Sequence, residues 1–258
     1  MTSTQVLYRN LSLKLKKTIT CHGVGLLALL CGLLITSPPA LATPDSLLTV
    51  RKTPDFEVNG KGTHTNWSRA EWFTLTQQRA AGPQLTTRAK VLYSATGMYF
   101  LMECEDRKLT ATLTEDFADL YNEDVVEVFL WTDQSVPVYL EYELSPLDYE
   151  LLIMVPNIEG KFYGWRPWHY EGAQKVRHAT SVQGGEKKSG SAITGWTAEF
   201  FIPYSVMKPI VLAPPTPGTR WRGNLYRIDY DAGMSAWSWQ KTRTNFHDYQ
   251  RFGTFVFE

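Results

Sequence analysis

Short runs rich in β-branched and aromatic residues follow one another along most of the chain, and no segment shows a long helical periodicity. The ten runs are 89–94, 98–105, 125–131, 138–144, 149–155, 175–182, 195–202, 221–231, 235–239 and 252–257. Turn residues separate them at intervals that are typical of a β-sandwich. We therefore predict an all-β fold, an antiparallel β-sandwich of about ten strands. Residues 58–75 are predicted to be irregular, with Trp67 and Trp72 as core residues.

The first 42 residues are predicted to be a signal peptide that is cleaved from the folded domain. Four basic residues precede an apolar run at 24–35, and small residues at Ala40 and Ala42 indicate cleavage after Ala42. The apolar run is shorter than the about 20 residues that a membrane-spanning helix needs. We expect residues 43–258 to be exported to the periplasm or the extracellular space, without membrane insertion.

The charge and length of the remaining chain limit its function classes. The signal segment holds four basic residues and no acidic ones, so 22 basic (26 minus 4) and 26 acidic side chains remain. This balance argues against a nucleic acid or an anionic membrane as partner. The 216 remaining residues (258 minus 42) suit a single domain, and the sequence does not indicate its oligomeric state. Cys104 is the one cysteine left, and its place among apolar residues predicts a buried, inert thiol.

Several predicted strands carry charged side chains on one face. Side chains alternate along a strand, so Glu127 and Phe129 share one face of the run 125–131. The same alternation places Glu141 on a face of 138–144 with other acidic residues, and Arg227 with Asp229 on a face of 221–231. A carboxylate among apolar groups is costly unless a donor bonds it. Two interpretations remain open, a solvated outer sheet and a polar binding surface.

The order of the sequence motifs resembles one known family. The motifs are DFEVNGKGTHTNWSRAE, AKVLYSATGMYFLMECED, DLYNEDVVEVFL, GWTAEFFIPYSVM, RGNLYRID and NFHDYQRFGTFVF. Together they resemble carbohydrate-binding module family 9 over essentially all of residues 43–258. The resemblance implies a β-sandwich related to DOMON-type sandwiches, often with structural calcium. It also implies non-catalytic binding of an oligo- or polysaccharide between two parallel aromatic rings.

The resemblance assigns a site to particular residues. Tyr121 matches the ring that precedes the D-x-V-E-x-F strand, and Phe246 matches the ring before the last F-G strand. Glu127 matches the family carboxylate that bonds sugar hydroxyls. Arg227 falls where the family has a polar side chain, and Glu141 occupies a position that is basic in the family. The resemblance thus predicts a carbohydrate site of Tyr121, Glu127, Arg227 and Phe246, with Glu141 as a possible addition.

Three tryptophans have two interpretations each. Trp237 either forms a wall of the pocket, as a further site residue, or packs in the core. Trp165 and Trp168 lie in the loop between 149–155 and 175–182. They either extend the site to a second sugar or cap the end of the sandwich.

Catalytic motifs were sought in the sequence. It has no G-x-S-x-G elbow, no H-E-x-x-H and no cysteine–histidine cluster, so we expect no enzyme and assign no catalytic residue. Calcium ligands are possible at Asp229 with Asp231, or at Glu123 with Asp124, and no specific set is assigned.

The alternative functions belong to different classes. A haem-binding electron-transfer domain of DOMON-like type would use methionine with histidine or lysine as iron ligands. The candidates are His64, His169, His178, His247, Met98, Met102, Met154 and Met234. A structural or protein-interaction module is the third possibility, and it would bind neither sugar nor haem.

Overall fold

The computed structural model describes residues 46–208, 210–211 and 214–258. The predicted signal peptide and its cleavage site lie outside these residues. The described part contains strands and five short 3-10 helices, and no α-helix. The 3-10 helices are η1 (Thr65–Arg69), η2 (Leu120–Asn122), η3 (Ile158–Gly160), η4 (Gly172–Gln174) and η5 (Tyr249–Arg251). None of these is long and apolar enough to cross a membrane.

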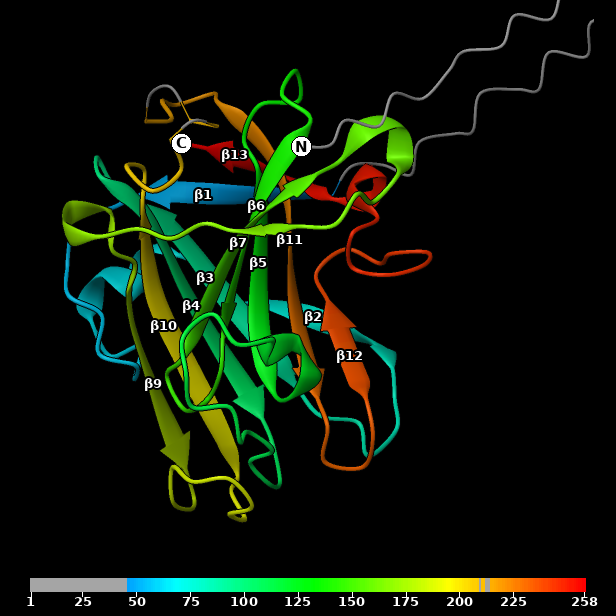
Figure 1. The fold of residues 1–258 in the computed structure, drawn as a ribbon. Coiled ribbons are helices and arrows are strands. Elements are labelled where there is room, and N and C mark those ends of the chain that lie inside the picture. The colour runs from blue at the N-terminus through cyan, green and yellow to red at the C-terminus, as the bar shows by residue number, and fades with distance from the viewer. Residues whose placement is uncertain (1–45, 209, 212–213) are drawn as a thin grey trace, which may run out of the picture. The chain divides into compact units, whose positions relative to one another are not determined.

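Two layers of strands face each other (Figure 1). The first has the order β8 (Arg166–Pro167), β7 (Glu150–Pro156), β6 (Val138–Leu144), β5 (Val125–Trp131), β11 (Arg220–Asp229) and β12 (Ser235–Ser238). The second has the order β3 (Thr87–Tyr93), β4 (Gly97–Glu105), β10 (Gly195–Pro203) and β9 (Arg177–Gln183). β2 (Phe73–Arg79) pairs with both β12 and β3 and so joins the layers at one edge.

The first and last strands join the layers a second time, and here the sheet is not antiparallel. β1 (Leu47–Lys52) runs parallel to β13 (Gly253–Phe257), and its last residues run parallel to β3. β13 in turn pairs with β11. The all-β prediction is confirmed, and the purely antiparallel arrangement is wrong because the two chain ends meet side by side. The ten predicted runs all form strands, and β1, β2 and β8 were not predicted.

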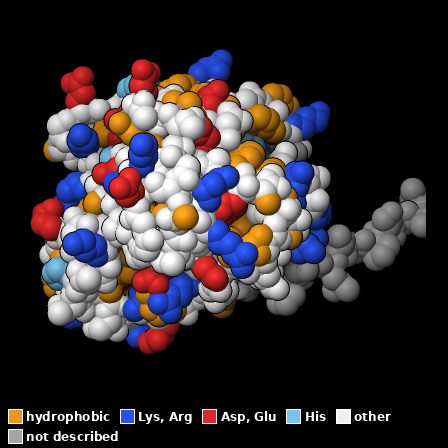
Figure 2. Space-filling model, turned by 90° about the horizontal axis from the view of Figure 1, so that it is seen from below, with side chains coloured by type: hydrophobic (Ala, Val, Ile, Leu, Met, Phe, Trp, Pro, Cys, Tyr) orange, Lys and Arg blue, Asp and Glu red, His pale blue; other side chains and the backbone are white. Residues whose placement is uncertain are grey.

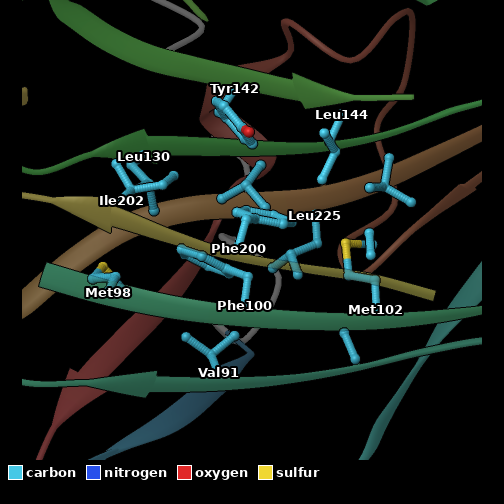
Figure 3. Packing of buried hydrophobic residues seen from close by; sticks show 14 of the residues in the cluster. Val91, Met98, Phe100, Met102, Leu130, Tyr142, Leu144, Phe200, Ile202 and Leu225 are labelled. Atoms are coloured by element: carbon cyan, nitrogen blue, oxygen red, sulfur yellow. The ribbon is translucent and has the colours of Figure 1, made fainter. Parts of the chain in front are cut away.

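Apolar side chains from both layers fill the space between them (Figure 3). Phe100 of β4 stacks on Phe200 of β10 with ring centroids 5.2 Å apart. Phe200 also contacts Tyr142 of β6 across the interior, at 4.9 Å. Val128 and Leu225 complete this contact from β5 and β11. Burial of each such side chain stabilises the fold by about 2 kcal/mol, so this interior holds the layers together.

Residues 54–72 form a loop that is tied to the second layer. The carboxylate of Glu199, on β10, accepts bonds from the Trp67 indole at 2.7 Å and from the amide of Asn59 at 2.9 Å. Trp67 is buried, as predicted. Trp72 is half-buried and packs against the core cluster that contains Trp67, and the Arg88 guanidinium lies 4.2 Å from its ring, so the core role predicted for it is confirmed in part.

A second apolar cluster lies on the opposite side of β5, β6, β7 and β11. It contains Val125, Phe129, Tyr139, Tyr226 and Ile228, which alternate in sequence with the residues that face the interior. Residues 113–121 and 246–252 pack over this cluster. The outer face of the first layer is therefore covered rather than solvated, and a cavity lies there.

Candidate functional site

A cavity of about 720 Å³ opens on the covered face of the first layer. Its floor comes from β5 and β6, with Ile153 of β7 and Ile228 of β11. Its walls come from η2, from the loop after β12 at 241–247, and from the loop that carries Phe162 and Trp165. A volume of this size matches small-molecule sites in proteins, which are about 300–1,000 Å³.

Glu127 of β5 and Glu141 of β6 line the floor, and Glu143 of β6 is buried beside them. Glu127 of β5 is the direct cross-strand partner of Glu143 of β6, and Phe129 is the partner of Glu141. Directly opposed side chains share a face, with Cβ atoms about 5 Å apart, so the three carboxyls gather on one surface. Their exposures are 2, 4 and 0 % for Glu127, Glu141 and Glu143. The interpretation as a solvated outer sheet is wrong, because these carboxyls are buried.

The buried carboxyls lack protein donors. Oε2 of Glu141 and both carboxyl oxygens of Glu143 have no hydrogen-bond partner. Burial raises the pKa of Glu127, Glu141 and Glu143 well above the ordinary value for glutamate, and in each case a neighbouring carboxyl raises the pKa further. The floor therefore keeps its protons to a higher pH than an exposed glutamate would.

His247 lies beside the carboxyls without neutralising them. Its Nδ1 is 2.7 Å from the hydroxyl of Tyr139 and 3.7 Å from Oε2 of Glu141. Burial lowers the pKa of His247 to about 4, so the imidazole is neutral at neutral pH. The Phe162 ring stacks on this imidazole with centroids 4.3 Å apart.

Aromatic rings line the walls above the carboxyls. Tyr121 and Phe246, the two rings named from the sequence, line the same cavity although they are 125 positions apart (246 minus 121). Phe246 stacks on Tyr226 with centroids 4.0 Å apart and an interplanar angle of 13°, so one of its faces is covered. The carbonyl of Tyr121 accepts a bond of 3.2 Å from the hydroxyl of Tyr230, which holds η2 against the end of β11.

The acid-rich turn before β5 owes its shape to its own carboxylates. Glu123 accepts bonds from the Thr112 hydroxyl and amide and, at 2.9 Å, from the Leu113 amide. Asp124 accepts the Thr110 amide at 2.6 Å and the Tyr230 amide at 2.9 Å. These bonds hold the segment that presents Tyr121. They also occupy the oxygens of Glu123 and Asp124, which argues against that pair as calcium ligands.

Arg227 and Trp237 do not lie at the cavity. Arg227 pairs with Val126 across β5 and β11, so its side chain points to the interior while Tyr226 faces the site with Glu127. The predicted hydroxyl contact of Arg227 is therefore wrong. Its guanidinium is 0 % exposed and 2.7 Å from Asp229.

Trp237 packs in the interior beside that guanidinium. The guanidinium of Arg227 lies 4.6 Å from the centre of the Trp237 ring. The Trp237 indole donates to the carbonyl of Leu85 at 3.0 Å. Of its two interpretations, core packing is therefore correct. Glu141, in contrast, does line the cavity beside Glu127.

One acidic group among the described residues has the spacing of a metal site. Carboxyl oxygens of Asp106, Asp229 and Asp231 lie within 4.8 Å of one another. Arg227 neutralises part of this charge, since its Nη2 is 3.2 Å from Asp106 and 2.7 Å from Asp229. Lys108 Nζ lies 4.0 Å from Asp231, so two cationic side chains face the three carboxyls, and the group resembles a divalent-cation site in its spacing.

The sequence reasoning missed several residues of the site. Phe162 and Tyr230 line the cavity, and neither lies in a pattern that marks a binding loop. Trp165 lines it as well, whereas Trp168 bonds the carbonyl of Val206 at 2.8 Å and packs on the interior. The interpretation as a site residue therefore holds for Trp165, and the interpretation as a cap of the sandwich holds for Trp168.

Comparison with known families agrees with this geometry. The model of the family described as carbohydrate family 9 binding domain-like matches residues 58–258. The chain belongs to this family. No curated protein sequence matches the chain.

Solved structures of similar fold include other members and relatives of family 9. A proposed carbohydrate-binding protein from Bacteroides uniformis has a TM-score of 0.69 at 16 % identity, covering 83 % of this chain and 100 % of its own. A family 9 module from Caldicellulosiruptor kristjanssonii in complex with cellotriose has a TM-score of 0.59 at 14 % identity, covering 83 % and 94 %. The glucose complex of a family 9 module from the same organism has a TM-score of 0.59 at 14 % identity, covering 83 % of this chain and 96 % of its own. At these identities the likeness establishes the fold.

Three of the four methionines proposed for haem, Met98, Met102 and Met154, lie apart from the cavity. Met98 and Met102 of β4 are fully buried between the layers (Figure 3). His178 bonds Asp148 at 3.0 Å on the other layer. Only His247 and Met234 of the candidate ligands line the cavity, and Met234 Sδ accepts a bond from Arg79.

Proposed function

We propose that this family 9 domain binds a carbohydrate in the cavity over β5 and β6, without catalysis. The observation that carries the proposal is the combination of aromatic walls with a buried carboxyl at the cavity, Glu141, whose Oε2 has no hydrogen-bond partner. Sugar hydroxyls supply donors to such carboxyls, and an aromatic ring desolvates the C–H face of a sugar. Tyr121, Phe246 and Trp165 would contact the faces, and Glu127 and Glu141 the hydroxyls.

The arrangement of the carboxyls favours binding over hydrolysis. Glycosidases place two carboxyls on either side of the scissile bond, about 5–10 Å apart. Here Glu127, Glu141 and Glu143 stand side by side on one floor. A sugar above them meets carboxyls on a single side, which suits recognition. Incubation with oligosaccharides should therefore leave their length unchanged, as chromatography of the mixture would show.

The test of carbohydrate binding is a glycan array probed with residues 43–258, followed by calorimetry on the glycans that bind. Tyr121→Ala and Phe246→Ala should each weaken binding about tenfold or more, because each removes a stacking surface. Trp72→Ala is the matched control, an aromatic truncation on the other layer, and should leave affinity unchanged. Thermal unfolding of every variant must show that the fold persists. Binding that survives both cavity variants would place the ligand elsewhere.

We propose calcium as a structural ion at Asp106, Asp229 and Asp231. Its support is the convergence of their carboxyl oxygens within 4.8 Å of one another, with three carboxyls beside the two cationic side chains Arg227 and Lys108. Calcium should raise the unfolding temperature of chelator-treated protein, and Asp231→Asn should reduce that rise. A rise that is equal in the variant would exclude this group.

Export remains a proposal, supported by the basic and apolar pattern of residues 1–42. N-terminal sequencing of the protein from an exported fraction should begin at Thr43.

The charge pattern is that of a solvated surface, since acidic and basic side chains are intermixed on the face shown in Figure 2. The haem alternative predicts an absorption band near 400 nm, and the carbohydrate proposal predicts a colourless protein.

A further inference from the structure

The cavity floor carries acid without a matching base. Within 4 Å of Glu127, Glu141 and Glu143, the described residues provide no lysine or arginine nitrogen. The nearest nitrogen of an ionisable side chain is Nδ1 of His247, and that ring is neutral. Glu141 is nine-tenths buried and more, lines the cavity and keeps one oxygen unpartnered.

The cations at the cavity lie at its rim rather than its floor. Arg79, Lys241 and Arg243 line the opening, and all three are exposed. Arg243 is already engaged, because its guanidinium is 2.7 Å from Asp248. The floor therefore faces the ligand with carboxyls alone.

A metal ion is a poor match for this floor. The described residues contain one group of three acidic side chains whose oxygens converge, Asp106 with Asp229 and Asp231, and it lies outside the cavity. An ammonium group offers three N–H donors and a positive charge, and charge-assisted bonds of this kind are about twice as strong as neutral ones.

We propose that the preferred ligand is a glycan that carries a free amine, an amino sugar without its acetyl group, whose ammonium binds beside Glu141 and Glu127. This inference rests on the proposed carbohydrate function and names the substrate class of the same cavity. Aromatic rings would contact the sugar face, while the ammonium replaces the missing protein cation. A neutral sugar forms only neutral hydrogen bonds with the protonated carboxyls and binds less tightly.

Binding of an ammonium to this floor is coupled to protons. Ionisable groups from five segments surround the floor. β5 carries Glu127, β6 carries Tyr139, Glu141 and Glu143, and the segment around η2 carries Asp119 and Tyr121. β11 and the residue that follows it carry Tyr226 and Tyr230, the loop after β12 carries Lys241, Arg243 and His247, and Arg79 lies at the rim. The carboxyls are protonated when the cavity is empty because burial raises their pKa. An ammonium favours the carboxylate, so it displaces a proton of the floor to solvent.

The experiment compares three β-1,4-linked trimers that differ in the substituent at C2. Cellotriose has a hydroxyl, the chitin trimer an acetamide, and the fully deacetylated trimer an amine. Calorimetry at pH 6.5 should give about tenfold tighter binding of the amine trimer than of cellotriose. Repeating the titration in buffers of different ionisation enthalpy should show release of about one proton for the amine trimer and none for cellotriose.

Variants assign the preference to the floor. Glu141→Gln keeps the shape of the side chain and should remove most of the preference for the amine, with a smaller effect on cellotriose. Glu186→Gln, in the exposed turn between β9 and β10, is the matched control for non-specific attraction and should change nothing. Unfolding curves confirm that both variants fold.

The outcomes separate this inference from the proposed function. Cellotriose binding as tightly as the amine trimer, or an amine preference that Glu141→Gln retains, would overturn the amine inference and leave carbohydrate binding in place. If no trimer and no array glycan binds, the proposed function itself falls.

Discussion

Arg227 shows how a residue of the predicted site serves the fold instead. Its guanidinium is buried between Asp106 and Asp229, donates to the Glu105 carbonyl at 2.6 Å and lies over Trp237. Buried charges persist only when they are paired and hydrogen-bonded, and here both conditions are met. The residue therefore acts on stability, through the place where β4 and β11 meet across the interior.

Replacement of Arg227 tests this assignment. Arg227→Met should lower the free energy of unfolding by about 3–5 kcal/mol, because it leaves Asp106 and Asp229 buried without their partner. Denaturant titration measures the loss. The double variant Arg227→Met/Asp229→Asn should recover part of it. If the variant kept its stability and lost sugar binding, Arg227 would be a residue of the binding site after all.

The sequence predicts which side chains share a face within one strand, but it does not predict how neighbouring strands pair. Alternation placed Glu127 opposite the interior residues of β5 correctly, because it depends on one strand alone. The face on which Arg227 lies depends on whether Arg227 or Tyr226 is the cross-strand partner of Glu127. A register shift of one residue would move the Arg227 side chain from the interior to the cavity face. The burial of Glu141 also depends on residues 113–121 and 246–252, which cover the strand from distant parts of the sequence.

Among the elements, the turn before β5 positions a residue of the site through hydrogen bonds to one of its carboxylates. Glu123 bonds the backbone of residues 112–113 and so anchors the segment that carries Tyr121. Glu123→Ala should speed amide hydrogen exchange in residues 110–122. It should also weaken sugar binding several-fold without contact to the sugar.

The neighbouring acid of that turn provides the control. Glu115 is exposed, and Glu115→Ala should change neither exchange nor affinity. Unchanged exchange in Glu123→Ala would mean that the turn is held by its other contacts, such as those of Asp124.

The loop between β7 and β9 contains two tryptophans with separate roles. Trp165 lines the cavity, so Trp165→Ala should weaken sugar binding with little effect on the unfolding midpoint. Trp168 packs on the interior and bonds the Val206 carbonyl, so Trp168→Ala should cost about 3 kcal/mol of stability. Calorimetry and thermal unfolding of both variants measure the two effects. A reversal of the two results would contradict these positions.

The strands were largely predictable because each run is long, apolar and bounded by turn residues. β8 has two residues and no pattern to detect, and β2 has polar residues at 74, 76, 77 and 78. The parallel pairing of β1 with β13 joins residues about 200 positions apart, and nothing local in either strand specifies it. The closure of the sandwich is thus a property of the whole chain rather than of its segments.

For the whole molecule, the buried carboxyls determine how stability depends on pH. Burial raises the pKa of Asp124 to about 8 and, despite the nearby Arg227, that of Asp106 to about 7, while Glu127, Glu141 and Glu143 are raised well above their ordinary value. A carboxyl with a raised folded pKa binds more protons in the folded than in the unfolded state. Stability is therefore fully present below the unfolded pKa, near 4, and is lost as the pH rises toward the folded pKa.

The two buried histidines shift in opposite directions and define the useful pH window. Burial lowers the pKa of His247 to about 4, so its contribution to stability rises between about pH 4 and 6.5 and opposes that of the carboxyls. The pKa of His178 is raised, because its bond to Asp148 and the charge of Glu150 outweigh its burial, and its contribution is lost above about pH 6.5. Between pH 6.5 and 8 the contributions of His178 and of the carboxyls fall together, while that of His247 stays constant.

The free energy of unfolding should accordingly decrease from pH 6.5 to 8, by at most about 1.4 kcal/mol per pH unit for each carboxyl that stays protonated in the folded state. Denaturant titrations with chelator present measure it without a contribution from bound calcium. Glu143→Gln should flatten the decrease and make the protein more stable than the wild type at pH 8, because the amide carries no charge to bury. A stability that rises over this interval would mean that the carboxyls of the floor are ionised in the folded protein, and the cation that compensates them would then have to be found.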